Sequence, residues 1–227
     1  MIIPIFFRKY FHVSLLILLT LLPIAYAYDK GVLDKIIEAA ANDYGKKAVE
    51  RLKRWCKMME TNVDKEESQK LTAVNDFVNS LERESDMDNY GQEDYWATPL
   101  ELLGRNRGDC EDFSIAKYFS LTMLGVPVAK LRISYVTALE LQEAHIVLAY
   151  YKTPGSEPLI LDILKPEIFL ASLRPDLKPI YSFNGEFIWM SKGEEKELKV
   201  GMPKMIGRFE KWGDLQSKMQ HEISLGE

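Results

Sequence analysis

The apolar pattern of this chain changes its period at Gly125-Val126-Pro127, and this change constrains the fold more than any other feature. Before that point, apolar residues recur at spacings of three and four, which is the period of a helix. After it they alternate or form short continuous runs, which is typical of strands. Helices therefore come first and a sheet afterwards, which predicts the α+β class with a mostly antiparallel sheet.

The helical part begins with a pattern over residues 32–59, which Gly45 divides into two helices. Another amphipathic helix is expected over about 66–81, and we interpret the charged stretch 82–94 as a loop. The sequence YWATPLE (95–101) then has the form of a helix N-terminus with a capping box. Trp96 in this segment is either a core aromatic, which composition favours, or a wall of a site.

A cysteine stands at the start of the next helical pattern, in GRNRGDCEDFSIAKYFSL (104–121). At such a position, backbone amides and the helix dipole favour the thiolate of Cys110 and can bind a developing oxyanion. The neighbours Asp109, Glu111 and Asp112 act in the opposite direction, because negative charge raises a thiol pKa. Their ordinary role is helix capping, but three carboxylates within four residues also match the oxygen ligands that calcium prefers.

The sheet part contains four strand signals. Residues 131–136 alternate as in a half-buried strand, whereas 145–151 and 159–163 are nearly continuous apolar runs and are expected to be central strands. An Asn184-Gly185 turn between aromatic runs indicates a hairpin.

One histidine and one carboxylate interrupt these apolar runs, and each needs a partner if it is buried. If the strands that carry His145 and Asp162 are adjacent and antiparallel, a stagger or a bulge can set the two side chains together. With Cys110 they then match a thiol triad of nucleophile, base and orienting carboxylate. Zinc is not expected, because no second Cys or His lies at ligand spacing.

The N-terminal segment 1–27 has the form of a secretory signal, with a basic pair, a leucine-rich run and a small-x-small end at Ala25-Tyr26-Ala27. We expect cleavage after Ala27, although an uncleaved membrane anchor remains the alternative. Residues 28–227 then form a single domain, helical over 28–125, mainly sheet over 126–195, with a C-terminal segment 196–227. The net charge of the whole chain is −5, so nucleic acid is not an expected partner.

Export places Cys56 and Cys110 in an oxidising compartment, where a disulfide could join them. Cys56 lies on an apolar helical face and is most simply a buried structural thiol. The alternative is a non-catalytic exported binding module with a Cys56–Cys110 disulfide.

Five segments resemble one known family, the bacterial transglutaminase-like cysteine proteinases. They are YWATPLELL, GDCEDFSIAKYFSL, AHIVLAYY, LILD and RPDLKPIYSFN, in that order over about 95–189. One departure is Ile163, where such proteins often have Asn. The resemblance implies a papain/transglutaminase-like fold with Cys110 as nucleophile, His145 as base and then acid, and Asp162 orienting His145. It also implies calcium at Asp109, Glu111 and Asp112.

For function, the resemblance implies a calcium-dependent endopeptidase of the periplasm. Such proteases cut a large surface adhesin near its N-terminus at an alanine pair, which releases the adhesin and disperses biofilm. An inner-membrane receptor for cyclic di-GMP sequesters the protease through the periplasmic domain of the receptor. A transglutaminase-like acyl transferase would use the same triad and remains an alternative.

Overall fold

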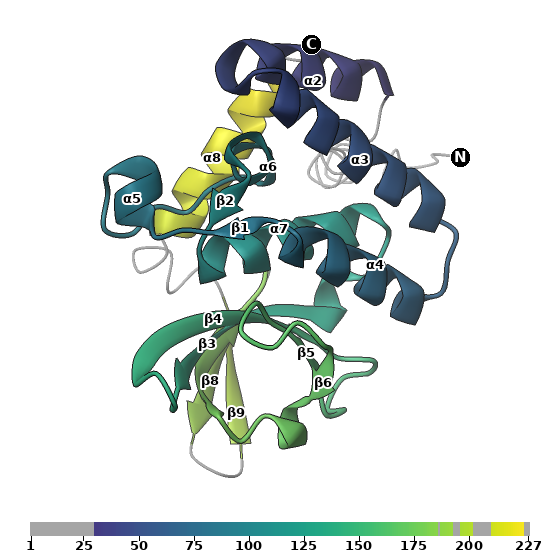
Figure 1. Cartoon of the computed structure of the whole chain (residues 1–227). Coiled ribbons are helices and arrows are strands. Elements are labelled where there is room, and N and C mark those ends of the chain that lie inside the picture. The colour runs from purple at the N-terminus through teal and green to yellow at the C-terminus, as the bar shows by residue number, and fades with distance from the viewer. Residues whose placement is uncertain (1–29, 186, 193–195, 202–209, 225–227) are drawn as a thin grey trace, which may run out of the picture.

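The computed structural model describes residues 30–185, 187–192, 196–201 and 210–224, and it places a layer of helices on one side of a curved sheet (Figure 1). The predicted signal segment and its cleavage site lie outside the described residues. Among the helices that are described, none is both long and apolar enough to span a membrane. The α+β class predicted from the order of the patterns is confirmed.

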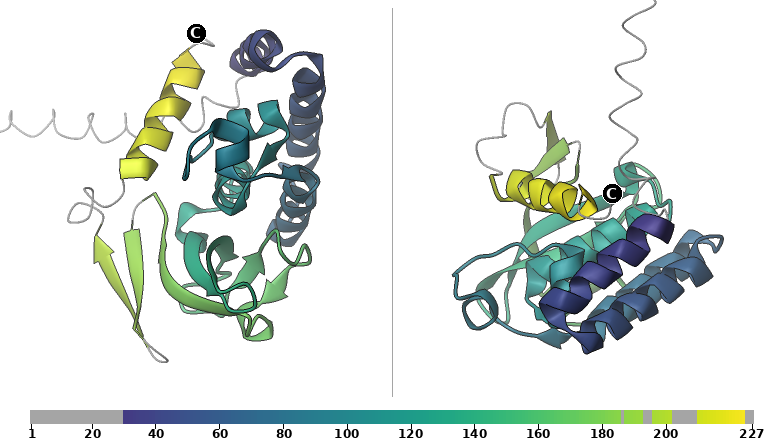
Figure 2. Two further views of the ribbon diagram at one scale, coloured as in Figure 1. Left: turned by 60° about the vertical axis from the view of Figure 1, so that its left-hand side comes forward. Right: turned by 90° about the horizontal axis from the view of Figure 1, so that it is seen from above.

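The helices within 30–79 and 99–123 lie where the helical period and the capping signals predict them, and Gly45, with a φ of 78°, separates the first two. The helices at 86–90 and 210–224 were not predicted. Their bounds are α2 (Lys30–Tyr44), α3 (Lys46–Asn62), α4 (Glu67–Asn79), α5 (Asp86–Tyr90), α6 (Pro99–Arg105), α7 (Cys110–Met123) and α8 (Glu210–Ser224). The predicted capping box at the start of α6 is present, with Thr98 as N-cap and Glu101 as its partner. Figure 2 shows from two further sides that the helices lie on one side of the sheet.

Seven strands form the main sheet in the order β6-β5-β4-β3-β7-β8-β9, and every neighbouring pair is antiparallel. Their bounds are β3 (Leu131–Ala138), β4 (Glu143–Tyr150), β5 (Leu159–Leu161), β6 (Phe169–Leu170), β7 (Leu177–Phe183), β8 (Phe187–Lys192) and β9 (Lys196–Gly201). Single-turn 3-10 helices precede β3 (η1, Val128–Lys130) and follow β6 (η2, Ala171–Leu173). The predicted hairpin at Asn184-Gly185 connects β7 and β8, and β4 and β5 are both interior strands of the sheet.

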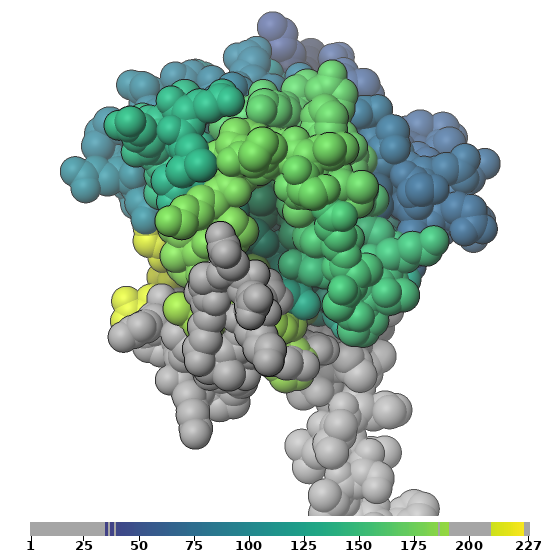
Figure 3. Space-filling view, turned by 90° about the horizontal axis from the view of Figure 1, so that it is seen from below, coloured from purple at the N-terminus to yellow at the C-terminus, as the bar shows by residue number. Residues whose placement is uncertain are grey.

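The prediction that β3 is half-buried is wrong, because both of its faces are covered. Arg132 is 8% exposed, Ser134 9% and Val136 3%. On the face away from the helices, Val136 packs in a second apolar cluster with Val147, Ala149 and Ile160. Figure 3 shows this face of the molecule, where the segments coloured green surround a hollow. The alternation in the sequence therefore marks two buried faces of different polarity.

The stretch 82–94 was interpreted from the sequence as a loop. It contains two short elements, a strand and a helix. Strand β1 (Glu82–Arg83) pairs in parallel with β2 (Arg107–Gly108), and α5 follows. Ser85 caps α5 by accepting a hydrogen bond from the backbone of Asp88, and Gly91 ends it in the left-handed region with a φ of 68°. Elements of two and five residues are too short to show a period in the sequence. The β1–β2 pair fixes the backbone that leads directly to Cys110.

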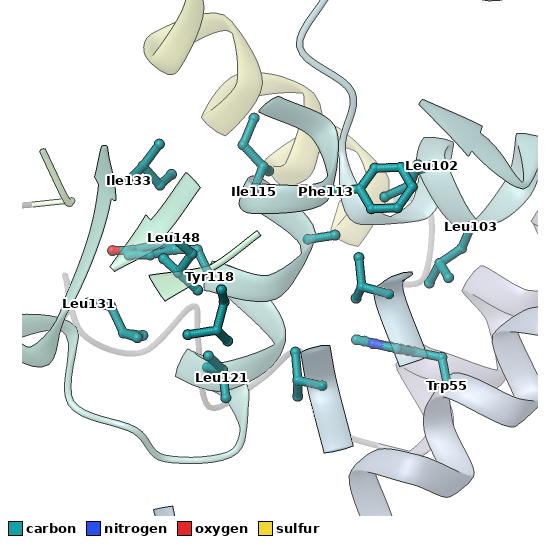
Figure 4. Close-up of a cluster of buried hydrophobic side chains, with 14 of the residues drawn as sticks. Trp55, Leu102, Leu103, Phe113, Ile115, Tyr118, Leu121, Leu131, Ile133 and Leu148 are labelled. Atoms are coloured by element: carbon teal, nitrogen blue, oxygen red, sulfur yellow. The ribbon is translucent and has the colours of Figure 1, made fainter. Parts of the chain in front are cut away.

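Helix α7 is the central element of the core. Figure 4 shows the helix between the sheet residues Leu131, Ile133 and Leu148 and the helical residues Trp55, Leu102 and Leu103. Its own side chains are buried along most of its length, including Phe113 and Leu121 at 1% and 0% exposure. Because α7 packs on both layers, the position of its first residue depends on the whole core.

Leu121→Ala should lower the free energy of unfolding by about 2–5 kcal/mol, since it removes a buried side chain and leaves a cavity between the layers. Urea denaturation followed by circular dichroism measures this loss. Leu139→Ala is the matched control, because Leu139 is 47% exposed and should change stability by less than about 0.5 kcal/mol. Equal effects of the two substitutions would contradict the central position of α7.

Candidate active site

Cys110 is the first residue of α7, as the sequence predicts, and it is half-buried. Asp109 is the N-cap and forms a capping box with Asp112, so the local sequence fixes the helix start. The thiol donates a hydrogen bond to Glu111 Oε2 at 3.1 Å. Burial, and then the charges of Glu111 and Asp109, raise the pKa of the Cys110 thiol well above its usual range. A positive charge beside these carboxylates would favour the thiolate.

His145 and Asp162 form a buried pair, with 2.7 Å between His145 Nε2 and Asp162 Oδ1. The β4–β5 ladder pairs Leu148 with Leu161, so His145 and Asp162 are diagonal neighbours across the two strands. The predicted stagger is therefore present, and the register of these two strands contains no bulge. Because Nε2 faces the carboxylate, it carries the proton of a neutral imidazole and Nδ1 is left as the basic nitrogen.

Asp162 is held as a carboxylate. Burial alone would raise the pKa of Asp162, but hydrogen bonds from His145 and Arg174 lower it to about 2. The backbone amides of Ile163 and Leu164 also donate to Oδ1, at 2.6 and 3.2 Å. The position where the family often has Asn thus contributes its main chain to the site. An ionised carboxylate at this place stabilises a protonated His145.

Three further polar groups surround Asp162, and none of them was predicted from the sequence. Arg174 Nη2 donates to Asp162 Oδ2 at 2.7 Å. Asn79 and Lys117 donate to the backbone oxygen of Asp162 at 2.9 and 3.3 Å. Burial lowers the pKa of Lys117 to about 7. The only sequence signal for them was a charged or amide side chain within an otherwise apolar pattern, at Asn79 and Lys117.

A cleft of about 630 Å³ brings the candidate residues to one place, since its lining includes both Cys110 and His145. Asp162 is 1% exposed and lies behind His145. Trp96 is 6% exposed, stacks on Phe183 and does not belong to the lining, so its interpretation as a core aromatic is confirmed.

Both cysteines are thiols in the structure, so the alternative with a Cys56–Cys110 disulfide is wrong. Cys56 is buried in α3 within the main apolar cluster. Its surroundings are therefore those of a structural thiol, as its place on an apolar helical face predicts.

The carboxylates beside Cys110 form a cluster that could hold a metal ion. Oxygens of Asp86, Asp109 and Asp112 lie within 4.8 Å of one another, and a second group joins Asp86, Asp94 and Glu111. Asp86 and Asp94 come from the stretch that was interpreted as a loop, and no sequence pattern places them beside Cys110.

The chemistry of this cluster fits a hard cation. Within the described part of the chain, Asp86 Oδ1 and Asp109 Oδ1 are buried and accept no hydrogen bond. Burial, followed by the charge of Glu111, raises the pKa of Asp109 to about 9. A cation would supply the missing partner of these oxygens and return the acids to their ionised form, in which they are ligands. Among the three predicted ligands, Asp112 is the least available to a cation, because its Oδ1 already accepts a hydrogen bond from the backbone amide of Ala97 at 2.7 Å.

Comparisons with known proteins agree with this geometry. Residues 44–174 match the family described as bacterial transglutaminase-like cysteine proteinase, BTLCP. A search of curated proteins finds no match. Among solved structures, EGTA-treated LapG of Legionella pneumophila is similar at 40% identity and a TM-score of 0.72, over 82% of this chain and 97% of LapG. A second LapG structure of the same organism has 41% identity and a TM-score of 0.70, over 82% of this chain and 97% of LapG. Calcium-bound LapG has 40% identity and a TM-score of 0.68, over 82% of this chain and 98% of LapG.

A cysteine at a helix start that shares one cleft with a His-Asp pair is the arrangement expected of a cysteine proteinase. The chain belongs to the bacterial transglutaminase-like cysteine proteinase family. The resemblance of its motifs to this family is therefore confirmed, as is the transglutaminase-like fold.

Proposed function

We propose that this protein is an exported, calcium-dependent cysteine endopeptidase with Cys110, His145 and Asp162 as its triad. The observation that carries the proposal is the buried His145–Asp162 pair, which shares one cleft with the cysteine at the start of α7. Membership of a cysteine proteinase family supports the reaction class.

In the proposed reaction, His145 Nδ1 takes the proton of the Cys110 thiol, and the sulfur attacks a peptide carbonyl. The protonated imidazole, which Asp162 stabilises, then gives its proton to the leaving amine and an acyl-enzyme remains. A water molecule, deprotonated by His145, hydrolyses this thioester and restores the thiol. Asp162 keeps the proton of the neutral ring on Nε2, so Nδ1 is the base in both halves of the cycle.

Calcium would be held by Asp109, Glu111 and Asp112, together with Asp86 from α5. When bound, it supplies positive charge beside the cysteine, which opposes the effect of the carboxylates on the thiol pKa. The similarity to a LapG structure that is calcium-bound supports this choice of metal.

For the substrate we propose a large cell-surface adhesin, cut in its N-terminal region. Cleavage would release the adhesin from the outer membrane and disperse biofilm, under the control of an inner-membrane cyclic di-GMP receptor. The protein would act in the periplasm after cleavage of the signal near Ala27. These assignments extend the family resemblance, and their support is the 40% identity to LapG over nearly all of that protein.

The test is to incubate residues 28–227 with outer-membrane fractions that carry such an adhesin and to sequence the new N-termini. We expect one calcium-dependent cut near the adhesin N-terminus. A labelled primary amine in the same reaction separates the alternatives, because a transglutaminase would attach the amine to the product and a protease would not. Products that carry the amine, or no new N-terminus, would contradict the proposal.

A further inference from the structure

Arg174 is a buried positive charge directly behind the proposed triad. The residue is 2% exposed and follows η2, on the face of the sheet away from the helices. Nη2 donates to Asp162 Oδ2 at 2.7 Å and to Asp176 Oδ2 at 2.9 Å, and Nε donates to Asp176 Oδ1 at 3.0 Å. A buried guanidinium is tolerated only when it is paired in this way. Its position therefore depends on two carboxylates, one of them in the triad.

The two oxygens of Asp162 have different partners. Oδ1 faces His145 Nε2 and the backbone amides of Ile163 and Leu164. Among the described residues, Oδ2 accepts its hydrogen bond from Arg174. If Arg174 were lost, Oδ2 would be a buried acceptor without a donor, and the Asp162 carboxylate could rotate about its Cβ–Cγ bond.

The other polar side chains near this place do not duplicate the contact. Lys117 from α7 and Asn79 from α4 donate to the backbone oxygen of Asp162 and not to its carboxylate. Lys165 lies at the outer end of the network, where Nζ is 3.2 Å from Asp176 Oδ1. Asp176 thus holds Arg174 from the far side, and within the part of the chain that the structure describes, Arg174 is the side chain that donates to Asp162 Oδ2.

We propose that Arg174 is a positioning residue of the active site: it fixes the plane of the Asp162 carboxylate so that Oδ1 stays on His145 Nε2. This rests on the proposed function of the triad. An arginine suits the place because its planar fork reaches two carboxylates in fixed directions, which the single ammonium of lysine cannot do. His145 then keeps Nδ1 free for Cys110.

The first experiment measures kcat and KM for an adhesin N-terminal fragment in Arg174→Lys and Arg174→Ala. Loss of the fork should lower kcat by about 100-fold while KM stays within about twofold, because misplacing a catalytic group by about an ångström has this cost. Lys165→Met is the matched control: it removes a charge from the same network but leaves the Arg174–Asp162 contact, so kcat should stay within about twofold.

Chemical rescue separates positioning from general destabilisation. A cavity of about 170 Å³ adjoins Arg174, so ethylguanidinium has room to enter when the side chain is truncated. We expect millimolar ethylguanidinium to restore kcat of Arg174→Ala by at least about tenfold and to leave Lys165→Met unchanged. If Arg174→Ala does not fold, Arg174→Lys and the spectroscopic measurement below decide.

The second experiment needs no turnover, so its failure is distinct from a failure of the proposed function. In a Cys110→Ala background, ¹⁵N NMR reports which ring nitrogen of His145 carries the proton. We expect Nε2–H with Arg174 and a mixed tautomer in Arg174→Lys. An unchanged tautomer, or a fall in kcat that matches lost stability and is not rescued, would overturn the positioning role. A wild-type protein that cleaves nothing would instead overturn the proposed function.

Discussion

Cys110→Ala is expected to lower proteolysis of an adhesin N-terminal fragment by at least about 1000-fold while leaving the fold intact. The reason is chemical, because the substitution removes the only atom in the cleft that the proposed reaction makes covalent with the substrate. The side chain is half-buried at the start of α7, so little packing is lost. Cleavage assays and circular dichroism on the same preparation measure both properties.

Cys56→Ala is the matched control for this experiment, since it removes the other thiol of the chain. Cys56 is a buried residue of α3 and does not belong to the cleft lining. We expect nearly full activity with a small loss of stability. Substantial cleavage by Cys110→Ala would rule out Cys110 as the nucleophile.

Removal of calcium is expected to have the second largest effect. A strong chelator should abolish cleavage, and added calcium should restore it. Calcium at about 100 times its Kd should raise Tm by about 5–10 °C, because binding to the folded state alone contributes about 2.7 kcal/mol. Thermal unfolding with and without calcium measures this shift.

Variants locate the metal. Asp109→Asn combined with Glu111→Gln should remove the calcium-dependent part of Tm, since both carboxylates belong to the acidic groups beside Cys110. Glu143→Gln should keep the calcium-dependent rise in Tm, because Glu143 lines the same cleft but belongs to neither of the two acidic groups that could hold the metal. A Tm that is indifferent to calcium in the unsubstituted protein would remove the metal proposal altogether.

The parts of the site that sequence reasoning identified are those with a local signature. Cys110 stands at a helix start with a capping pattern, and His145 and Asp162 interrupt apolar runs, where a polar side chain needs a partner. The fold class followed from the change of period for the same reason. Local spacing carries this information because helix and strand each repeat within a few residues.

Asp86 and Arg174 could not be identified in this way. Asp86 reaches the acidic cluster through the pairing of β1 with β2, two-residue strands that leave no pattern in the sequence. Arg174 reaches Asp162 because the chain after β5 and β6 covers the far face of the sheet, a face that alternation in β3 predicted to be open to solvent. Both depend on tertiary pairing that a single sequence does not encode locally.

The central place of α7 has a consequence for how this protein loses activity. The helix that carries Cys110 is buried between the sheet and the other helices, so its N-terminus cannot loosen without disturbing the core. Cys110 therefore lies in a region of high local stability, where opening costs nearly the whole unfolding free energy. Inactivation by denaturant and global unfolding should then be a single cooperative event, and a partly unfolded but active state should not accumulate.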